Sequence, residues 1–94
     1  MPKAIWKDTV IAETESFEMV EGNVYFPEDS LKKEFFKEST YETVCPWKGT
    51  ANYYSVEVGG ETLKDAAWVY KTPKAKAMNL KDHYAFWKGV KVEK

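Results

Sequence analysis

Short runs of apolar and β-branched residues, separated by tight turns, recur along the chain and are typical of β-strands. In the first part of the chain these runs are Lys3–Trp6, Thr9–Ala12, Phe17–Val20 and Val24–Phe26. The best strand pattern is Thr50–Val58, and Glu61–Tyr70 is its expected partner. Gly59 and Gly60 separate them as a two-residue hairpin turn. Because tight turns join antiparallel neighbours, the pattern predicts a mainly β, antiparallel domain.

One segment has the pattern of a short helix. Pro27 is followed by Glu28 and Asp29, and both proline and acidic residues are favoured in the first turn of a helix. Leu31 and Phe35 are four positions apart and would share one helical face. The sequence therefore predicts one helix of fewer than three turns after Pro27.

The C-terminal part is expected to end in a hairpin. Lys74–Leu80 has room for a single helical turn. Tyr84–Trp87 and Val90–Val92 then bracket Lys88 and Gly89, which predicts two paired strands with a turn between them. The 94 residues fit a single domain that spans residues 1–94.

Composition adds a surplus of aromatic rings to this picture. The chain has 4 Trp, 6 Tyr and 5 Phe, and a core of this size cannot hide all of them. Trp and Tyr have one apolar and one polar end, so they suit a groove or an interface. We therefore expect some of the rings to line a groove.

Charge and ligand chemistry exclude several functions. The formal net charge is −1, and all 14 basic residues are lysines, which argues against nucleic-acid binding. No apolar run approaches the ~20 residues of a membrane span, and no signal-peptide pattern opens the chain, so we expect no membrane attachment and a cytoplasmic protein. One Cys and one His cannot build a structural zinc site, and we expect no metal and no cofactor.

One segment combines the chain's only cysteine with a tryptophan and a lysine in a predicted turn, Cys45-Pro46-Trp47-Lys48-Gly49. Pro46 suits the second position of a β-turn, and Gly49 suits a strand re-entry that needs unusual φ. Lys48 on the same side as Cys45 would favour the thiolate, which is the nucleophilic form. The alternative is that Cys45 is a small packed residue and Lys48 a solvated turn residue. In either case we expect Lys48→Ala to leave stability almost unchanged.

Four segments together resemble a known family. They are Val20-Glu21-Gly22-Asn23-Val24-Tyr25-Phe26-Pro27, the Cys45–Gly49 turn with Ala51 and Tyr53, Asp65-Ala66-Ala67-Trp68-Val69-Tyr70 with Pro73, and Ala85-Phe86. Their order and spacing resemble domain-of-unknown-function family 427, which also carries a nucleotidyltransferase-like label. The resemblance implies a tent-like pair of antiparallel sheets with a pocket between them. The sequence contains no glycine-rich phosphate loop and no pair of acids placed for two metal ions, as nucleotidyl transfer would require.

If the Cys45 turn, the Asp65–Tyr70 strand and the Asn23–Tyr25 segment meet, they would form a site with aromatic walls and polar ends. The walls would be Trp47, Trp68, Tyr70 and Tyr25, and the polar ends Cys45, Lys48, Asn23 and Asp65. Each aromatic residue has an alternative role in an ordinary core. Asp65 has an alternative role in capping a turn, and His83 is either solvated or a general base for Cys45.

Three functions are consistent with these residues. The first is a binding module whose aromatic groove holds a small molecule or a peptide segment. The second is an enzyme in which Cys45 is the nucleophile and Lys48 or His83 assists, in transfer or thiol chemistry. The third is a scaffold or oligomerisation unit, and we expect a monomer or a weak homodimer.

Overall fold

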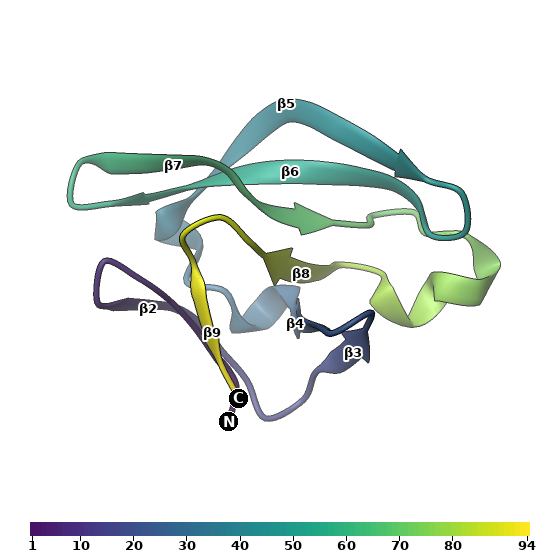
Figure 1. The fold of residues 1–94 in the computed structure, drawn as a ribbon, viewed down its shortest axis with the longest axis horizontal. Coiled ribbons are helices and arrows are strands. Elements are labelled where there is room, and N and C mark those ends of the chain that lie inside the picture. Colours follow the sequence, from purple (N-terminus) through teal and green to yellow (C-terminus); the bar gives the residue numbers. More distant parts are fainter.

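The structure is a computed structural model that describes all 94 residues, and it consists of two antiparallel sheets joined by short turns (Figure 1). The smaller sheet has the strand order β2-β1-β9, with bounds Lys3–Trp6 (β1), Thr9–Glu13 (β2) and Lys91–Glu93 (β9). Pairing of β1 with β9 places the two ends of the chain side by side. The tent-like pair of sheets predicted from the family resemblance is confirmed.

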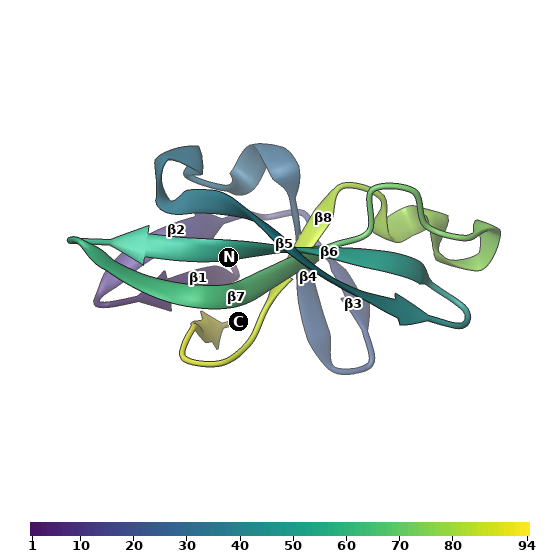
Figure 2. The ribbon, with the colours of Figure 1, turned by 90° about the horizontal axis from the view of Figure 1, so that it is seen from above.

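The larger sheet has six strands in the order β3-β4-β8-β7-β6-β5. Its strands are Glu18–Val20 (β3), Asn23–Pro27 (β4), Phe36–Cys45 (β5), Gly49–Val58 (β6), Glu61–Val69 (β7) and His83–Phe86 (β8). The small sheet and the β6–β7 turn lie at one end of the molecule, and the β5–β6 turn lies at the other, in both views (Figures 1 and 2).

Two-residue turns set the register of the hairpins. Gly59 and Gly60 both have positive φ and join Val58 to its partner Glu61, as predicted. Lys7 and Asp8 make the equivalent turn between β1 and β2, with φ values of 53° and 58°. Turns with two left-handed residues match the twist of paired strands, so they favour tight hairpins.

Alternation along the strands divides the large sheet into two faces. Side chains on the inner face pack against the small sheet, and they alternate along most of the strands with those on the other face. This inner core contains Ala4, Ile11, Ala12, Val24, Phe26, Leu31, Val56, Ala66, Ala67, Val69, Tyr84 and Phe86. Full burial of one such large apolar side chain is worth ~1.5–3 kcal/mol, so this contact between the sheets is the main stabilising layer.

The opposite, outer face of the large sheet has a second buried cluster. We call it the outer cluster, and its members are Tyr25, Ala51, Tyr53, Tyr70, Ala77, Leu80 and Ala85. Ala77 and Leu80 come from η3 (Ala75–Leu80), a pair of short 3-10 turns that covers this face beside the β5–β6 turn. Both faces of the large sheet therefore carry apolar side chains, but only the inner face has a second sheet against it.

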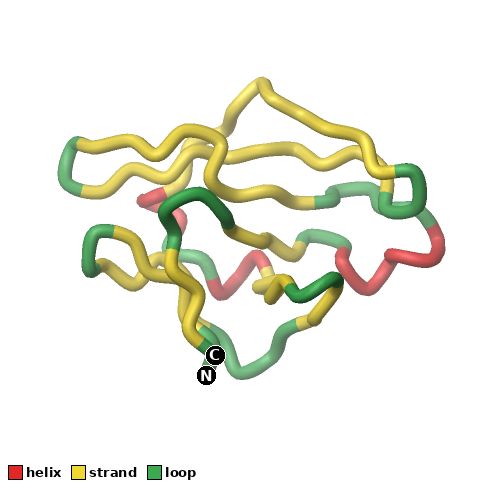
Figure 3. Tube along the Cα trace, in the orientation of Figure 1, coloured by secondary structure: helices red, strands yellow, loops and turns green.

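The predicted helix after Pro27 is wrong. Two single 3-10 turns are present instead, η1 (Glu28–Ser30) and η2 (Lys33–Phe35), and the chain enters β5 directly after them (Figure 3). Leu31 is extended between them and bridges to Ala12 of β2. Burial of Leu31 against the small sheet thus outweighs a weak helical pattern. None of the helical segments is long and apolar enough to cross a membrane.

The predicted C-terminal hairpin is also wrong. β8 pairs with β4 and β7 inside the large sheet, whereas β9 pairs with β1 in the small sheet. Lys88 and Gly89 therefore carry the chain from one sheet to the other. Sequence pattern identifies both strands, but it does not identify their partners, because pairing across the chain depends on the tertiary arrangement.

Gly49 provides a test of the β5–β6 turn. Its φ is +110°, outside the regions that residues with a Cβ adopt readily, although an added Cβ would meet its nearest atoms at 3.6 Å or more. We expect Gly49→Ala to lower the free energy of unfolding by about 1–3 kcal/mol through backbone strain. Urea denaturation measures this change.

Gly89→Ala is the matched control. Gly89 lacks a positive φ, and an added Cβ would make ordinary contacts of 3.5 Å or more with Trp6 and Leu63. We expect its stability to stay within ~1 kcal/mol of the wild type. Equal losses in the two variants would contradict the strain assigned to Gly49.

Candidate functional site

The β5–β6 turn places the Cys45–Gly49 segment at one end of the outer face. Cys45 pairs with Gly49, and Pro46, Trp47 and Lys48 form the loop between them. The loop rests on the segment before η3, because the Lys74 N–H donates to the Lys48 carbonyl at 3.0 Å. The predicted turn is confirmed, and this backbone hydrogen bond fixes its position on the segment before η3.

Lys48 is buried, contrary to the expectation of a solvated turn lysine. The residue is 7% exposed, and its ammonium forms an ion pair with the carboxylate of Glu21. Its Nζ lies 5.2 Å from the centre of the Trp47 ring and 5.7 Å from that of Tyr70. Burial alone would lower the pKa of Lys48, but the Glu21 hydrogen bond and the nearby phenols outweigh it, so the pKa is raised. The ammonium therefore stays charged beside the rings of Trp47 and Tyr70.

Glu21 reaches Lys48 from the β3–β4 turn. Its φ is +54°, a conformation that glycine and asparagine adopt more readily than glutamate. Its side chain remains 56% exposed. The hydrogen bond and the charge of Lys48 lower the pKa of the Glu21 carboxyl, and the Trp47 side chain acts in the same direction. Glu21 is thus an ionised carboxylate, exposed on one side and bound to a buried cation on the other.

Two tyrosines complete the surroundings of the ammonium. Burial raises the pKa of Tyr70 to about 12, although Lys48 opposes this shift. Burial also raises the pKa of Tyr25, whose hydroxyl accepts a 3.2 Å hydrogen bond from Trp68 Nε1. Both phenols stay protonated at neutral pH, so both hydroxyls can donate to a bound group.

Cys45 lies against the same residues. Its thiol is free and half-buried, and it packs against the outer cluster. The sequence grouped Cys45, Trp47, Lys48, Tyr25, Trp68 and Tyr70, and the structure brings these six residues together. We call them, with Glu21, the Lys48 cluster. The role of Cys45 as a nucleophile stays a prediction.

A row of rings extends from the Lys48 cluster across the outer face. Trp68 packs edge-on to Tyr25 at 6.2 Å between ring centres and to Trp87 at 6.1 Å. Tyr53 lies 6.4 Å from Trp68 and 4.8 Å from Tyr41. Trp87 and Tyr41 are partly exposed, at 43% and 48%. The aromatic surplus in the composition is therefore placed along one open face of the sheet.

Asp65 is placed away from the Lys48 cluster. It has a φ of +55° at an irregularity in the β6–β7 pairing. Its carboxylate accepts a hydrogen bond from Ser39, its N–H donates to Ser55 Oγ at 3.1 Å, and its carbonyl accepts one from Trp87 Nε1 at 2.6 Å. These contacts give Asp65 the structural role that the sequence left open, at the far end of the aromatic row.

Asn23 and His83 have different locations. Asn23 begins β4, two residues after Glu21, and is half-buried beside the turn that carries this carboxylate. His83 begins β8, opposite Pro27, and its Nδ1 lies 2.8 Å from the Lys81 carbonyl. The contacts of His83 do not connect it with Cys45.

The cavities of the structure lie on other surfaces. An open polar cavity lies beside the segment that joins β2 to β3, and it is lined by Met1, Glu13, Thr14, Glu15, Ser16, Pro27, Asp29, Ser30 and His83. A smaller cleft of about 230 Å³ is lined by Glu28, Leu31, Lys33, Phe36, Tyr54 and Tyr84. Apart from His83, no residue proposed from the sequence lines either one. Neither cavity includes Lys48 or Glu21.

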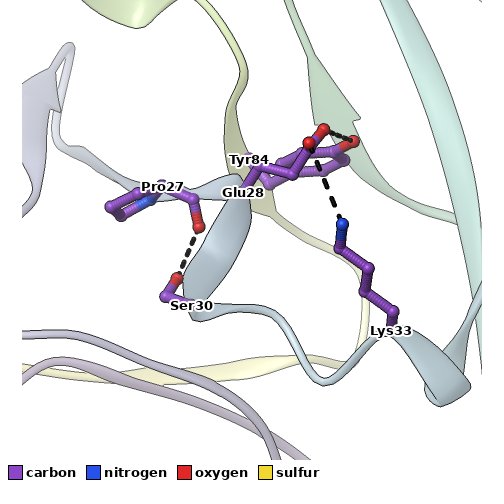
Figure 4. Close-up of polar contacts among 5 residues, drawn as sticks. All are labelled: Pro27, Glu28, Ser30, Lys33 and Tyr84. Atoms are coloured by element: carbon purple, nitrogen blue, oxygen red, sulfur yellow. Dashed lines mark hydrogen bonds and ion pairs between the residues drawn. The ribbon is translucent and has the colours of Figure 1, made fainter.

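The smaller cleft has its own polar contacts, shown in Figure 4. The Glu28 carboxylate accepts a 3.2 Å hydrogen bond from the Tyr84 hydroxyl and lies 3.9 Å from Lys33 Nζ. Burial raises the pKa of Tyr84 far above its ordinary value, and Tyr54 and Glu28 add to the effect. Since the cleft's carboxylate is already paired, these groups satisfy one another.

Sequence reasoning missed Glu21 and the extension of the row through Tyr41 and Trp87. The sequence marks this turn as the Glu21-Gly22 pair between two strand patterns, but nothing in it connects Glu21 with Lys48. In the structure Glu21 has a left-handed φ, as the turn residues Lys7 and Lys88 also do. No group of three or more His, Cys, Asp or Glu residues is arranged to hold a metal ion.

Fold and site together define a small β-domain of two antiparallel sheets, with an aromatic outer face and a buried lysine at one end. The chain belongs to the family described as domain of unknown function (DUF427), which it matches over residues 2–94. The resemblance proposed from the sequence segments is thereby confirmed. A comparison with curated proteins finds no match.

Burial of Lys48 reverses the stability expectation for this residue. Lys48→Ala removes a packed side-chain stem, so we expect the free energy of unfolding to fall by about 1–3 kcal/mol. Lys48→Met keeps most of the stem and should lose less. Lys7→Ala removes an exposed ion pair with Glu61 and should cost ~0–1 kcal/mol. Urea denaturation compares them, and a Lys48→Ala variant as stable as the wild type would contradict the buried role.

The ion pair also predicts a pH dependence. The pKa of Glu21 is lowered on folding, so its contribution to stability is present above the unfolded pKa near 4.5 and is lost as pH falls. The pKa of Lys48 is raised, so its contribution is present below 10.5 and is lost as pH rises through the folded pKa. We expect the stability difference between wild type and Glu21→Gln to be greatest between these limits. Chemical denaturation at several pH values measures it, and a difference independent of pH would contradict the assignment.

Proposed function

We propose that this protein is a cytoplasmic binding module that holds a small molecule or a peptide segment on the outer face, with the Lys48 cluster as its polar end. The observation that carries the proposal is Lys48, a residue that is 7% exposed and whose ammonium contacts one carboxylate and two aromatic rings. Burying a lysine costs free energy, and exposed surface for a lysine is plentiful. A charge kept at this cost, beside a row of partly exposed rings, supports a binding role.

The aromatic row supplies the apolar part of such a site. Trp47, Tyr41 and Trp87 are each 40–48% exposed, while Trp68 links Trp87, and through Tyr53 also Tyr41, to the buried Tyr25. Flat rings that are open on one side bind planar or apolar groups by stacking. The protonated hydroxyls and the ammonium at one end would fix the orientation of a ligand, as a few polar groups do in most small-molecule sites.

A screen of metabolites and short peptides by thermal shift and Trp fluorescence tests the proposal. A ligand present at a hundred times its Kd adds ~2.7 kcal/mol to stability, a readily measured shift. Trp68→Leu should abolish the shift by removing the centre of the row. Trp6→Leu is the matched control, since Trp6 packs with the inner core, and it should retain binding. Absence of any ligand, or equal loss in both variants, would contradict the outer-face site.

A further inference from the structure

We infer that the ligand of the outer face carries a carboxylate group, which replaces the side chain of Glu21 on the Lys48 ammonium. The inference rests on the proposed binding function and adds the chemical class of the ligand. It also means that the Glu21 carboxylate takes the place of the ligand's carboxylate on Lys48 when no ligand is bound. Three features of the cluster support it: an excess of hydrogen-bond donors, the exposure of Glu21, and the single charge of Lys48.

The donors around the site outnumber its acceptors. An ammonium has three N–H donors and no acceptor. Tyr25 and Tyr70 add two phenol hydroxyls, which are protonated at neutral pH as ordinary tyrosines are, and burial raises both pKa values further. The Tyr25 oxygen already accepts from Trp68 Nε1, so its own proton is free to be donated. Glu21 is the only carboxylate paired with Lys48. A group with several acceptor oxygens and negative charge matches this set.

Glu21 is held loosely compared with Lys48. Its side chain is 56% exposed, against 8% for Lys48. Its turn joins β3 of three residues to β4 of five, and β3 is an edge strand. Its left-handed backbone position disfavours glutamate. Glu21 can therefore rotate into water with its charge solvated, whereas Lys48 cannot leave without exposing its packed stem. Departure of Glu21 leaves the Lys48 ammonium without its carboxylate partner.

The charge balance favours a carboxylate over a phosphate. One buried ammonium neutralises one negative charge, and a dianion would keep a second charge in a partly buried place. The chain contains no arginine, so the two-pronged contact that suits phosphate is absent. The nearby Lys74 ammonium is already bonded to the Pro46 carbonyl at 2.8 Å and is exposed. An acid with an attached ring would place its carboxylate on Lys48 and its ring against Trp47 or Trp68.

Chemical rescue in a Glu21→Ala variant tests the inference directly. Removing the side chain leaves Lys48 without a carboxylate and leaves a gap that acetate can enter. We expect sodium acetate to raise the melting temperature of this variant in a saturable way, with an affinity at least about tenfold above that for the wild type. Acetamide, a neutral molecule of the same shape, and sodium chloride at equal ionic strength should not reproduce the shift.

Two control variants make the readout specific. Glu61→Ala removes the exposed partner of Lys7 and should show no selective response to acetate. Glu21→Ala combined with Lys48→Met removes the cation and should lose the response. If Glu21→Ala does not fold, Glu21→Gln provides the same comparison with a smaller gap. An acetate response equal to that for chloride, or one that persists without Lys48, would overturn the inference.

Larger carboxylates distinguish the sources of the group. Phenylacetate tests a free small acid, and Gly-Gly-Phe with a free or an amidated C-terminus tests a peptide end. Tighter binding of either acid to wild type than of its neutral amide supports the inference and identifies the source. Equal binding of acids and amides would overturn it while leaving the aromatic binding site in place. If no compound binds in a way that depends on Trp68, the result would instead contradict the proposed function itself.

Discussion

Burial of the Lys48 ammonium is the constraint that organises one end of this protein. A lysine residue that is 7% exposed requires opposite charge and polarisable surroundings, because an unpaired buried charge is strongly destabilising. The β3–β4 turn supplies the carboxylate, the β5–β6 turn supplies Trp47, and the end of β7 leads to Tyr70. One charged group thus connects both outer regions of the six-stranded sheet, whose edge strands are β3 and β5.

The two faces of the large sheet are covered by different elements. The inner face is covered by the small sheet, so alternating apolar residues there give an ordinary core. The outer face has only η3 as cover, and its remaining surface carries a row of large rings. Tyr and Trp can be buried on one side and wet on the other, which makes them suitable for a half-covered face. Stability and recognition would then come from opposite faces of the same sheet.

Glu21 connects the stability of the folded state with the recognition of a ligand. In the structure it neutralises Lys48 and completes the folded state, yet it is exposed enough to be exchanged for a ligand's acid group. A site that is closed by its own side chain avoids leaving a buried cation unpaired when no ligand is present. The cost is a glutamate in a left-handed turn position, which is acceptable because the turn belongs to a short hairpin.

Local chemistry in the sequence determined most of the strands, the Gly59-Gly60 hairpin, the Cys45–Gly49 turn and the family, since each depends on neighbouring residues or on the order of segments. The strand β5, Phe36–Cys45, was not among those predicted. The sequence also grouped Lys48 with Trp47, Trp68, Tyr25 and Tyr70. Only the tertiary structure decided that Lys48 is buried, that Glu21 is its partner, and that β9 leaves β8 to pair with β1. Glu21 and Lys48 are separated by 27 positions. A contact over that distance depends on how the sheet places its edge strands, and no local pattern of residues encodes it.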